Sequence, residues 1–434
     1  MTAVPRAWAA AVFLVTALHG QTGEHWVATW GTAQAQFRNA GRSGPVAAGR
    51  GTAPATPPPA PAKGPQRRFG IPPGLAGLNN QTVRMIARTS IGGRTLRIRL
   101  SNALGGTPVT IGAARLALRS KDSAIVPGSD RVVTFSGRAS AVMYAGQTLV
   151  SDPVSLQLPP LSDVAVSLYF PGETGAPTSH TFGLHTTYLS KKGDTTAQAE
   201  MTEADATHQS YYWLAGLDVL APADAGTLVT FGDSITDGDQ STPETNGMWP
   251  AVLAARLQAN RATAHIGVVN AGISGNRVFG DNGSALARLY HDVLSQPGVK
   301  WMTLMEGIND ITGASRQADG ASTLTADDLI AAYRQIIETA HLYGVKAIGC
   351  TLTPFGGSNV YNQDGEAIRD AANRWIRTGG AFDAVIDFDA ATRDASDPKR
   401  FSPLADSPDY LHPANPGYKM MADAVNLAIF SRRR

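Results

Sequence analysis

The pattern of hydrophobic and polar positions divides the chain into two parts. Between about residues 81 and 190, short runs alternate apolar and polar positions, as strands with one face in water do. The runs at 81–90 and 95–101 show this best, and the Gly-Gly pair at 92–93 between them is typical of a hairpin turn. We expect further strands at 113–118, 131–135, 148–150, 164–170 and 180–189, after a first one within 25–35. Such strands, joined by Gly and Pro turns, predict an all-β sandwich or jelly-roll-like domain.

The spacing of apolar positions changes beyond about residue 223, where buried strands alternate with amphipathic helices. The pattern predicts strands at 228–231, 264–269, 299–305, 345–352 and 384–388, and helices at 249–260, 286–294, 326–342, 366–377 and 415–430. Strands that alternate with helices in this way form a parallel sheet covered by helices on both faces. This second part is therefore expected to be an α/β domain.

The length of the chain agrees with this division. Its 434 residues exceed the roughly 100–200 residues of a usual single domain. We expect a signal peptide at 1–20, a β-sandwich-like accessory domain at 24–220 with a Gly/Pro-rich loop at 39–68, and an α/β domain at 225–434.

The N-terminal segment is typical of a secretory signal. Arg6 precedes an apolar stretch at 7–18, which is too short to span a bilayer and is followed by small residues near Gly20. We expect a secreted or periplasmic protein without a membrane anchor. The alternative interpretation is an N-terminal tail without a targeting role.

Charge and cysteine content narrow the possible functions. The 37 basic and 35 acidic residues give a net charge of +2, which offers no electrostatic reason to expect a nucleic acid as partner. Cys350 is the only cysteine, so an intrachain disulfide and a thiolate metal cluster are both excluded. It lies in an apolar run and is expected to be a buried strand residue.

Polar residues follow the predicted strands, where ligands bind in sheets of this kind. Ser234 follows the strand at 228–231, Gly275 the one at 264–269, and Asn309 the one at 299–305, while Asp409 and His412 precede the last helix. A serine hydroxyl needs an adjacent base, which a histidine oriented by a carboxylate can supply. Each segment alone also has a plain structural interpretation: a helix N-cap, two turns and a surface histidine.

Taken together and in this order, the segments resemble the SGNH hydrolases, also called GDSL esterases/lipases. The matching blocks are Gly232-Asp233-Ser234-Ile235, then Gly275, then Gly307-Ile308-Asn309-Asp310, then Asp409-x-x-His412. Ile235 stands where the family's name has Leu. The family's Asn-x-x-x-x-Gly spacing, counted from Asn270, selects Gly275 for the second block, with Gly272 as the alternative.

The resemblance implies a three-layer α/β/α flavodoxin-like fold and a role for each block. Ser234 would be the nucleophile, His412 its general base, and Asp409 the residue that orients His412. The Ser234 N–H, the Gly275 N–H and the Asn309 side-chain amide would form the oxyanion hole. The absence of a His-Glu-x-x-His pattern leads us to expect no metal, and we expect no diffusible cofactor. No Gly-x-Ser-x-Gly elbow surrounds Ser234, which disfavours an α/β-hydrolase.

The whole chain resembles one branch of the family, the arylesterases/acylhydrolases found beside xylan-degrading enzymes. A Trp-Val-x-Thr-Trp strand at 26–30 and the segment at 80–84 carry this likeness. It implies a small ester or acetylated carbohydrate as substrate, with short acyl groups. The alternatives are a lipase or lysophospholipase for longer acyl chains, with residues 313–325 as a lid, and a carbohydrate-binding protein whose hydrolase domain is inert. The oligomeric state stays open.

Other conspicuous residues have plainer interpretations. His208 and His341 also follow a carboxylate by three residues, but we expect both to be surface residues rather than rival bases. His180 and His185 are expected to be structural residues of a strand. The aromatic cluster at 211–213 would form core at the domain junction or, alternatively, a platform for sugar stacking.

Overall fold

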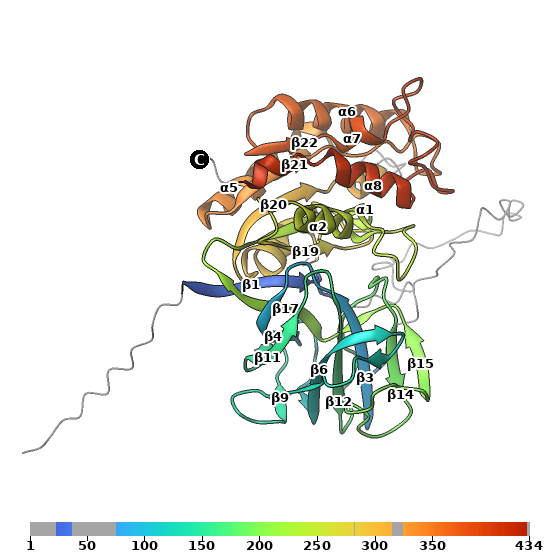
Figure 1. Cartoon of the computed structure of the whole chain (residues 1–434). Helices are drawn as coiled ribbons and strands as arrows, with labels where there is room; N and C mark the ends of the chain where they lie inside the picture. The colour runs from blue at the N-terminus through green and yellow to red at the C-terminus, as the bar shows by residue number, and fades with distance from the viewer. Residues whose placement is uncertain (1–22, 37–74, 282, 315–323, 432–434) are drawn as a thin grey trace, which may run out of the picture.

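The structure is a computed structural model that describes residues 23–36, 75–281, 283–314 and 324–431. The expected signal peptide at 1–20 and the Gly/Pro-rich loop at 39–68 lie outside these residues, as does most of the 313–325 segment. In Figure 1 a β-rich region, coloured blue to green, lies against an α/β region coloured yellow to red. Within the described ranges, no helix is both long and apolar enough to cross a membrane.

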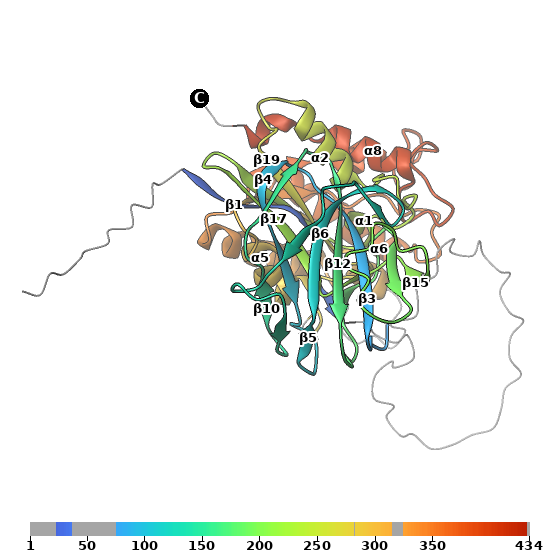
Figure 2. The ribbon, with the colours of Figure 1, turned by 60° about the horizontal axis from the view of Figure 1, so that its bottom comes forward.

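Two large antiparallel sheets build the N-terminal region. The first contains β1 (Glu24–Gly31), β17 (Leu214–Pro222), β4 (Gly93–Ser101) and β10 (Thr148–Val150) in that order, with β11 (Val154–Leu158) also paired to β4. The second contains β15 (Ala204–His208), β14 (Thr187–Ser190), β3 (Gln81–Arg88), β12 (Asp163–Phe170), β6 (Ala113–Lys121) and β7 (Ala124–Ile125), with β8 (Arg131–Val133) paired to β6. Figure 2 shows β6, β12 and β3 of the second sheet side by side.

Smaller strand groups complete this region. The strands β16 (Tyr211–Tyr212), β13 (Thr178–His180) and β2 (Ala35–Gln36) form one small sheet, and β5 (Val109–Ile111) pairs with β9 (Ala141–Met143). The two large sheets share one hydrophobic core, to which β3 and β12 contribute Val83 and Val166, and β4 and β17 contribute Leu96 and Leu217. The jelly-roll part of the expectation stays a prediction.

The β-region differs from the sequence expectation in several places, since short strands such as β5, β9, β11 and β15 have no counterpart among the expected strands. Two further differences have a clear physical reason. Residues 180–189 form not one strand but two, because Leu184 between β13 and β14 adopts a left-handed φ of 57°, which a strand does not accommodate. The long strand β17 has no counterpart among the expected strands. It is buried on both faces along most of its length, so its sequence lacks the alternation that marks a half-exposed strand.

The aromatic cluster at 211–213 belongs to the core of this region. Tyr211, Tyr212 and Trp213 are all buried and pack within the cluster of apolar side chains between the sheets. They therefore present no exposed platform for stacking on a sugar, and the core interpretation is confirmed.

The α/β region is built on a parallel five-stranded sheet. Its order is β19 (Ile266–Gly272), β18 (Gly226–Gly232), β20 (Val299–Met305), β21 (Lys346–Cys350) and β22 (Ala384–Ile386). This is the flavodoxin-like order, in which ligands bind at the carboxyl ends of the parallel strands, where the strand order reverses. The switch point lies at β18, between β19 and β20.

Helices cover both faces of this sheet, so the expected three-layer α/β/α arrangement is confirmed. They are α1 (Ser234–Asp237), α2 (Trp249–Ala259), α3 (Ala285–Leu289), α4 (Ile308–Ala314), α5 (Ala326–Leu342), α6 (Gln363–Thr378), α7 (Phe388–Thr392) and α8 (Asn415–Ala424). One group consists of α2, α7 and α8, and the other of α3, α4, α5 and α6, with contacts inside each group. A π-helix (Tyr290–Leu294) continues α3, and a short 3-10 helix (Leu427–Phe430) follows α8.

The first strand of the β-region joins the two parts. In Figure 1, β1 lies between β17 and β19. The Ala28 N–H donates to Thr227 Oγ1 at 3.0 Å, and the Val268 N–H donates to Ser90 Oγ at 2.8 Å. The edge strand β19 also pairs with Thr32, directly after β1, through an isolated parallel bridge at Asn270. The β-region is thus hydrogen-bonded to the sheet that carries the candidate site.

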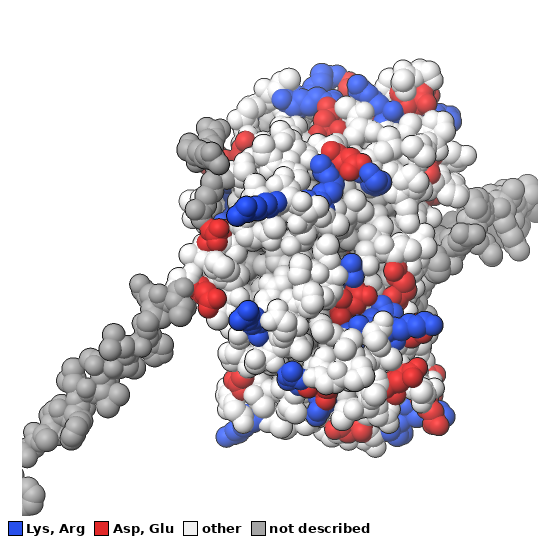
Figure 3. Space-filling model, in the orientation of Figure 1, with Lys and Arg blue, Asp and Glu red and all other residues white. Residues whose placement is uncertain are grey.

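Charged side chains are intermingled on the face shown in Figure 3. Basic and acidic groups lie close to one another there, with uncharged areas between them. This distribution agrees with the small net charge of +2, and that face presents no field of a single sign.

Candidate active site

Ser234 stands at the carboxyl end of the central strand β18. Asp233 caps the short helix α1, because its Oδ1 accepts the Ile235 N–H at 3.0 Å. Ser234 is therefore the first residue of a helix that is separated from the strand by Asp233 alone. This turn directs the serine toward the edge where the loops after β19 and β20 also emerge.

The structure brings Ser234, His412 and Asp409 together in one hydrogen-bonded chain. Ser234 Oγ lies 2.8 Å from His412 Nε2, and His412 Nδ1 lies 2.7 Å from Asp409 Oδ2. An ionised carboxylate only accepts hydrogen bonds, so Nδ1 carries a proton and Nε2 is free to accept from the serine hydroxyl. The three residues that were separated by up to 178 positions in sequence thus have the arrangement of a nucleophile, a base and an orienting acid.

The local backbone holds Asp409 in place. Its Oδ1 accepts the N–H groups of Leu411 at 2.9 Å and His412 at 3.0 Å, and the Ser407 hydroxyl at 3.0 Å. The Asp-x-x-His spacing therefore closes a turn in which the carboxylate is bound both to the backbone and to the ring. The hydrogen bonds from His412 outweigh burial and keep the pKa of Asp409 well below its usual range.

Two neighbouring carboxylates raise the pKa of His412. Burial by itself lowers the pKa of this histidine, but the hydrogen bond to Asp409 and the negative charge of Asp239 raise it, and the net pKa is higher than usual. Asp239 Oδ2 lies 3.9 Å from His412 Nε2, the nitrogen that faces the serine. The site therefore favours the imidazolium that forms when Ser234 gives up its proton.

The loop after β19 lies over α1. The Ile273 N–H donates to Gly232 O at 3.0 Å, and the Ser274 N–H donates to Asp237 Oδ2 at 2.8 Å. Gly275 follows with a φ of 79°, in the left-handed region that favours glycine. We call residues 273–276 the oxyanion loop, because Gly275 is the donor expected from the sequence.

Gly272, the alternative donor, has a different role. Its N–H already donates to Asn270 Oδ1 at 3.0 Å. A Cβ at this position would approach the Asp237 backbone nitrogen to 2.2 Å, so a glycine is required where β19 passes α1. Gly275 is thus the better candidate of the two.

Asn309 lies beside the oxyanion loop in the first turn of α4. Its Nδ2 donates to the backbone carbonyl of Asn276 at 2.8 Å. Asp310, the next residue, accepts the N–H groups of Val278 at 2.8 Å and Phe279 at 3.1 Å. Asn309 and Asp310 therefore hold residues 276–279 by hydrogen bonds. The Asn309 side-chain amide thereby lies beside the oxyanion loop.

A buried arginine beneath the site has no counterpart among the residues expected from the sequence. Arg288 donates to the carbonyl groups of Gly232 and Ala271 and to the side chains of Asn276, Asp292 and Glu306, at 2.8–3.0 Å. Asp233 and Glu306 lie near it, and burial raises the pKa of Asp233 to about 7 and that of Glu306 well above its usual value. The predicted helix over 286–294 gave no indication that this side chain points inward.

The rival histidines are engaged elsewhere. His208 hydrogen-bonds to the hydroxyl of Tyr212, and His341 Nε2 lies 2.9 Å from Asp383 Oδ2 rather than beside the carboxylate three residues before it. Cys350 is buried in β21, and burial raises the pKa of its thiol, which agrees with a structural residue. Across the described ranges, no group of three or more His, Cys, Asp or Glu side chains is arranged to hold a metal ion.

Comparison with known families identifies the second region. Residues 228–425 match the family model described as GDSL-like Lipase/Acylhydrolase. These residues are therefore similar to the GDSL, or SGNH, hydrolase domain, which acts on esters. No curated protein matches the chain.

Several solved structures are similar to part of this chain. An acetyl xylan esterase is 21% identical, with 46% of this chain and 96% of that one covered and a TM-score of 0.35. A variant of an acetyl-xylooligosaccharide esterase from Geobacillus is 27% identical, with 48% and 97% covered and a TM-score of 0.37. A GDSL-like lipase from Bacteroides thetaiotaomicron is 19% identical, with 47% and 87% covered and a TM-score of 0.33. Each likeness covers less than half of this chain.

Proposed function

We propose that this protein is a secreted serine esterase that hydrolyses short-chain acyl esters, including O-acetyl groups on carbohydrate. The observation that carries the proposal is the continuous chain of hydrogen bonds from Ser234 Oγ through His412 to Asp409, with distances of 2.8 and 2.7 Å. A serine without such a base is a weak nucleophile at neutral pH.

In the first half of the reaction, Ser234 Oγ attacks the ester carbonyl while its proton passes to His412 Nε2. The tetrahedral intermediate then collapses, the bond to the alcohol oxygen breaks, and His412 returns the proton to that oxygen. The acyl group remains on Ser234. In the second half, a water gives a proton to the same nitrogen and attacks the acyl carbon. The bond from that carbon to Ser234 Oγ then breaks, and His412 returns the proton to Oγ, which releases the acid and restores the serine.

The negative charge that develops on the carbonyl oxygen needs donors that are already in position. The candidates are the N–H groups of Ser234 and Gly275 and the Asn309 side-chain amide. Ser234 and Gly275 lie on segments that are hydrogen-bonded to each other through Ser274 and Asp237, and Asn309 is bonded to the residue after Gly275. Removal of one such donor typically lowers kcat by about 10²–10³-fold.

Two features favour a small acyl group and a hydroxyl-rich alcohol. Ser234 and His412 are only 5% and 6% exposed, which leaves little open surface around the nucleophile. Asp239 lies 3.9 Å from His412 Nε2, the nitrogen that protonates the departing alcohol. A carboxylate in this position is suited to accept a hydrogen bond from a second hydroxyl of the same sugar.

The test of the proposal is hydrolysis of p-nitrophenyl acetate, butyrate, octanoate and palmitate by the wild type and Ser234→Ala. We expect activity that peaks at acetate or butyrate and falls by about 10⁴-fold or more in Ser234→Ala. A peak at the long chains would support the lipase or lysophospholipase alternative. Activity on none of the esters, under conditions in which the protein is folded, would contradict the proposal.

The substrate class is tested with Asp239→Asn, at a pH on the plateau of the kcat/KM profile of each protein. We expect kcat/KM to fall by about tenfold or more on an acetylated xylo-oligosaccharide, because a hydrogen bond to a charged acceptor contributes about 1.5–3 kcal/mol. On p-nitrophenyl acetate, which has no second hydroxyl, the fall should be smaller, because only the support of the His412 imidazolium is lost. Asp370→Asn, an exposed carboxylate on α6, is the matched control. An equal loss on both substrates would contradict the sugar-binding role.

Secretion is tested separately by expression of the full chain in a bacterium that exports proteins. We expect the mature protein outside the cytoplasm, with its N-terminus near Gly20 or Gln21. A cytoplasmic product that keeps residues 1–20 would contradict this part of the proposal.

A further inference from the structure

A histidine from the β-region contacts the helix that carries the nucleophile. His180 is the last residue of β13, and its Nε2 lies 3.0 Å from Asp237 Oδ1. Asp237 is the last residue of α1, one turn after Ser234. Both side chains are largely buried where this pair crosses the junction between the two regions.

The second oxygen of Asp237 reaches the oxyanion loop. Asp237 Oδ2 accepts the Ser274 N–H at 2.8 Å, and Ser274 directly precedes Gly275. The carboxylate therefore links His180 on one side to the backbone of the oxyanion loop on the other. Both of its oxygens are engaged, which fixes the plane of the carboxylate and the direction of the Ser274 N–H bond.

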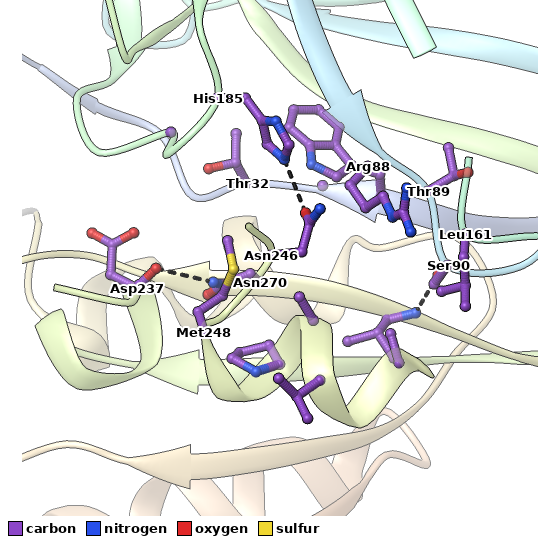
Figure 4. Close-up of a pocket in the computed structure, with 18 of the residues that line it drawn as sticks. Thr32, Arg88, Thr89, Ser90, Leu161, His185, Asp237, Asn246, Met248 and Asn270 are labelled. Carbon is purple, nitrogen blue, oxygen red and sulfur yellow. Dashed lines mark hydrogen bonds between the residues drawn. The ribbon is translucent and has the colours of Figure 1, made fainter. Parts of the chain in front are cut away.

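A cavity of about 310 Å³ lies between the two regions beside this pair, and both His180 and Asp237 line it. Figure 4 shows Asp237 at the wall of the cavity, next to Asn270. Asn270 Nδ2 donates to the backbone carbonyl of Thr236 at 3.0 Å. Because open space borders the pair, directional hydrogen bonds rather than close packing on that side must hold Asp237 in place.

The surroundings of His180 favour its charged form. Burial alone lowers its pKa, but the charge and hydrogen bond of Asp237 and backbone hydrogen bonds to Ala33 and Phe182 raise it, and the net pKa is above the usual value. A charged imidazolium donates through both nitrogens, one to Asp237 and one to the backbone of its own region. The pair is therefore fully hydrogen-bonded, as a buried ion pair must be to persist.

We propose that His180 is a positioning residue for the oxyanion loop: through Asp237 and the Ser274 N–H, it sets the place of Gly275 relative to Ser234. The inference rests on the proposed function. It gives the β-region a part in catalysis, because the region supplies the support of the oxyanion hole rather than a separate binding module. A displacement of about 1 Å in such a support typically costs up to about 10² in rate.

The test compares His180→Ala and His180→Gln with the wild type on p-nitrophenyl acetate. Active sites are counted by titration with diethyl p-nitrophenyl phosphate, so that misfolded protein does not enter the rate. We expect kcat per titrated site to fall by about 10–10²-fold in His180→Ala while KM changes by less than about threefold. His180→Gln, which keeps an N–H donor, should recover part of the loss. His341→Ala, which removes another histidine–aspartate pair on the catalytic domain, is the matched control and should retain wild-type kcat.

A second measurement follows the loop without the need for turnover. Amide hydrogen exchange in the peptide that spans residues 270–280 should be faster in His180→Ala than in the wild type and unchanged in His341→Ala. Wild-type kcat per titrated site in His180→Ala, or unchanged exchange in this peptide, would overturn the inference. If the wild type itself hydrolysed no ester, the proposed function would fail, and the exchange result alone would decide on the positioning role.

Discussion

Substitution of Arg288 by methionine should destabilise the catalytic domain more than any change at its surface. The arginine is 5% exposed and donates to Gly232, Ala271, Asn276, Asp292 and Glu306. Its guanidinium also lies 4.1 Å from the centre of the Phe231 ring. Methionine keeps much of the apolar volume but removes every donor. Two strand carbonyls and two carboxylates then lose their shared partner in a place that water does not reach.

The magnitude follows from the nature of the loss. Removal of one partner from a buried charge pair costs about 3–5 kcal/mol in the free energy of unfolding. Asp292 keeps its contact of 2.7 Å with His291 Nδ1, so we expect the lower part of that range. For a domain of this size, about 3 kcal/mol lowers Tm by about 6–12 °C.

Thermal unfolding, monitored by circular dichroism, measures this effect. The double variant Arg288→Met/Glu306→Gln should recover part of the lost stability, because it removes the uncompensated carboxylate as well. The matched control is Arg374→Met on the exposed side of α6, whose pair with Asp370 is worth about 0–1 kcal/mol at most. A Tm of Arg288→Met within 1–2 °C of the wild type would refute the reasoning that Arg288 holds the strand ends beneath the site.

Other expectations follow from the same geometry. Since His412 must be neutral to act as a base and its pKa is raised, kcat/KM should fall with decreasing pH through a value above the ordinary ~6.5, and Asp239→Asn should move that fall to lower pH. A flat pH profile down to about pH 5 would contradict a histidine base. Asn309→Ala should lower kcat by about 10²–10³-fold with little change in KM, and an unchanged kcat would remove it from the oxyanion hole. Asp409→Asn should lower kcat less than Ser234→Ala does, and wild-type activity would exclude Asp409 from the triad.

Much of the catalytic domain could be predicted from the sequence because its signals are local. The strand at 299–305 and the helix at 326–342 have the bounds that their patterns predict, since the first is a short apolar run and the second has a clear helical period. Thr325 and Asp328 at the start of α5 form a capping box, which marks where the helix begins. The spacing of Asp409 and His412 is also local, and the structure closes it into one hydrogen-bonded turn.

The β-region was harder to predict for a physical reason. The strand β11 alternates buried and exposed residues over only five residues and was also missed. The strand β17 is buried on both faces between β1, β4 and the rest of the molecule. The sequence of a strand that is buried on both faces does not alternate apolar and polar residues, so the pattern does not reveal it. Within β17, Asp218 is buried and accepts hydrogen bonds from both Arg97 and Arg99. A pattern of apolar positions does not predict a charged residue in the interior of a strand.

The sequence by itself determined the order of the chemistry-bearing segments and the kind of element that each one follows, because motifs and hydrophobic periods are properties of neighbouring residues. The tertiary structure alone decided which distant groups support them. Arg288 joins the ends of β18, β19 and β20, and His180 reaches Asp237 from another region of the chain, 57 residues away. Neither contact can be recognised from the hydrophobic period of the sequence, because burial and hydrogen bonding at such sites depend on how separate elements pack in space.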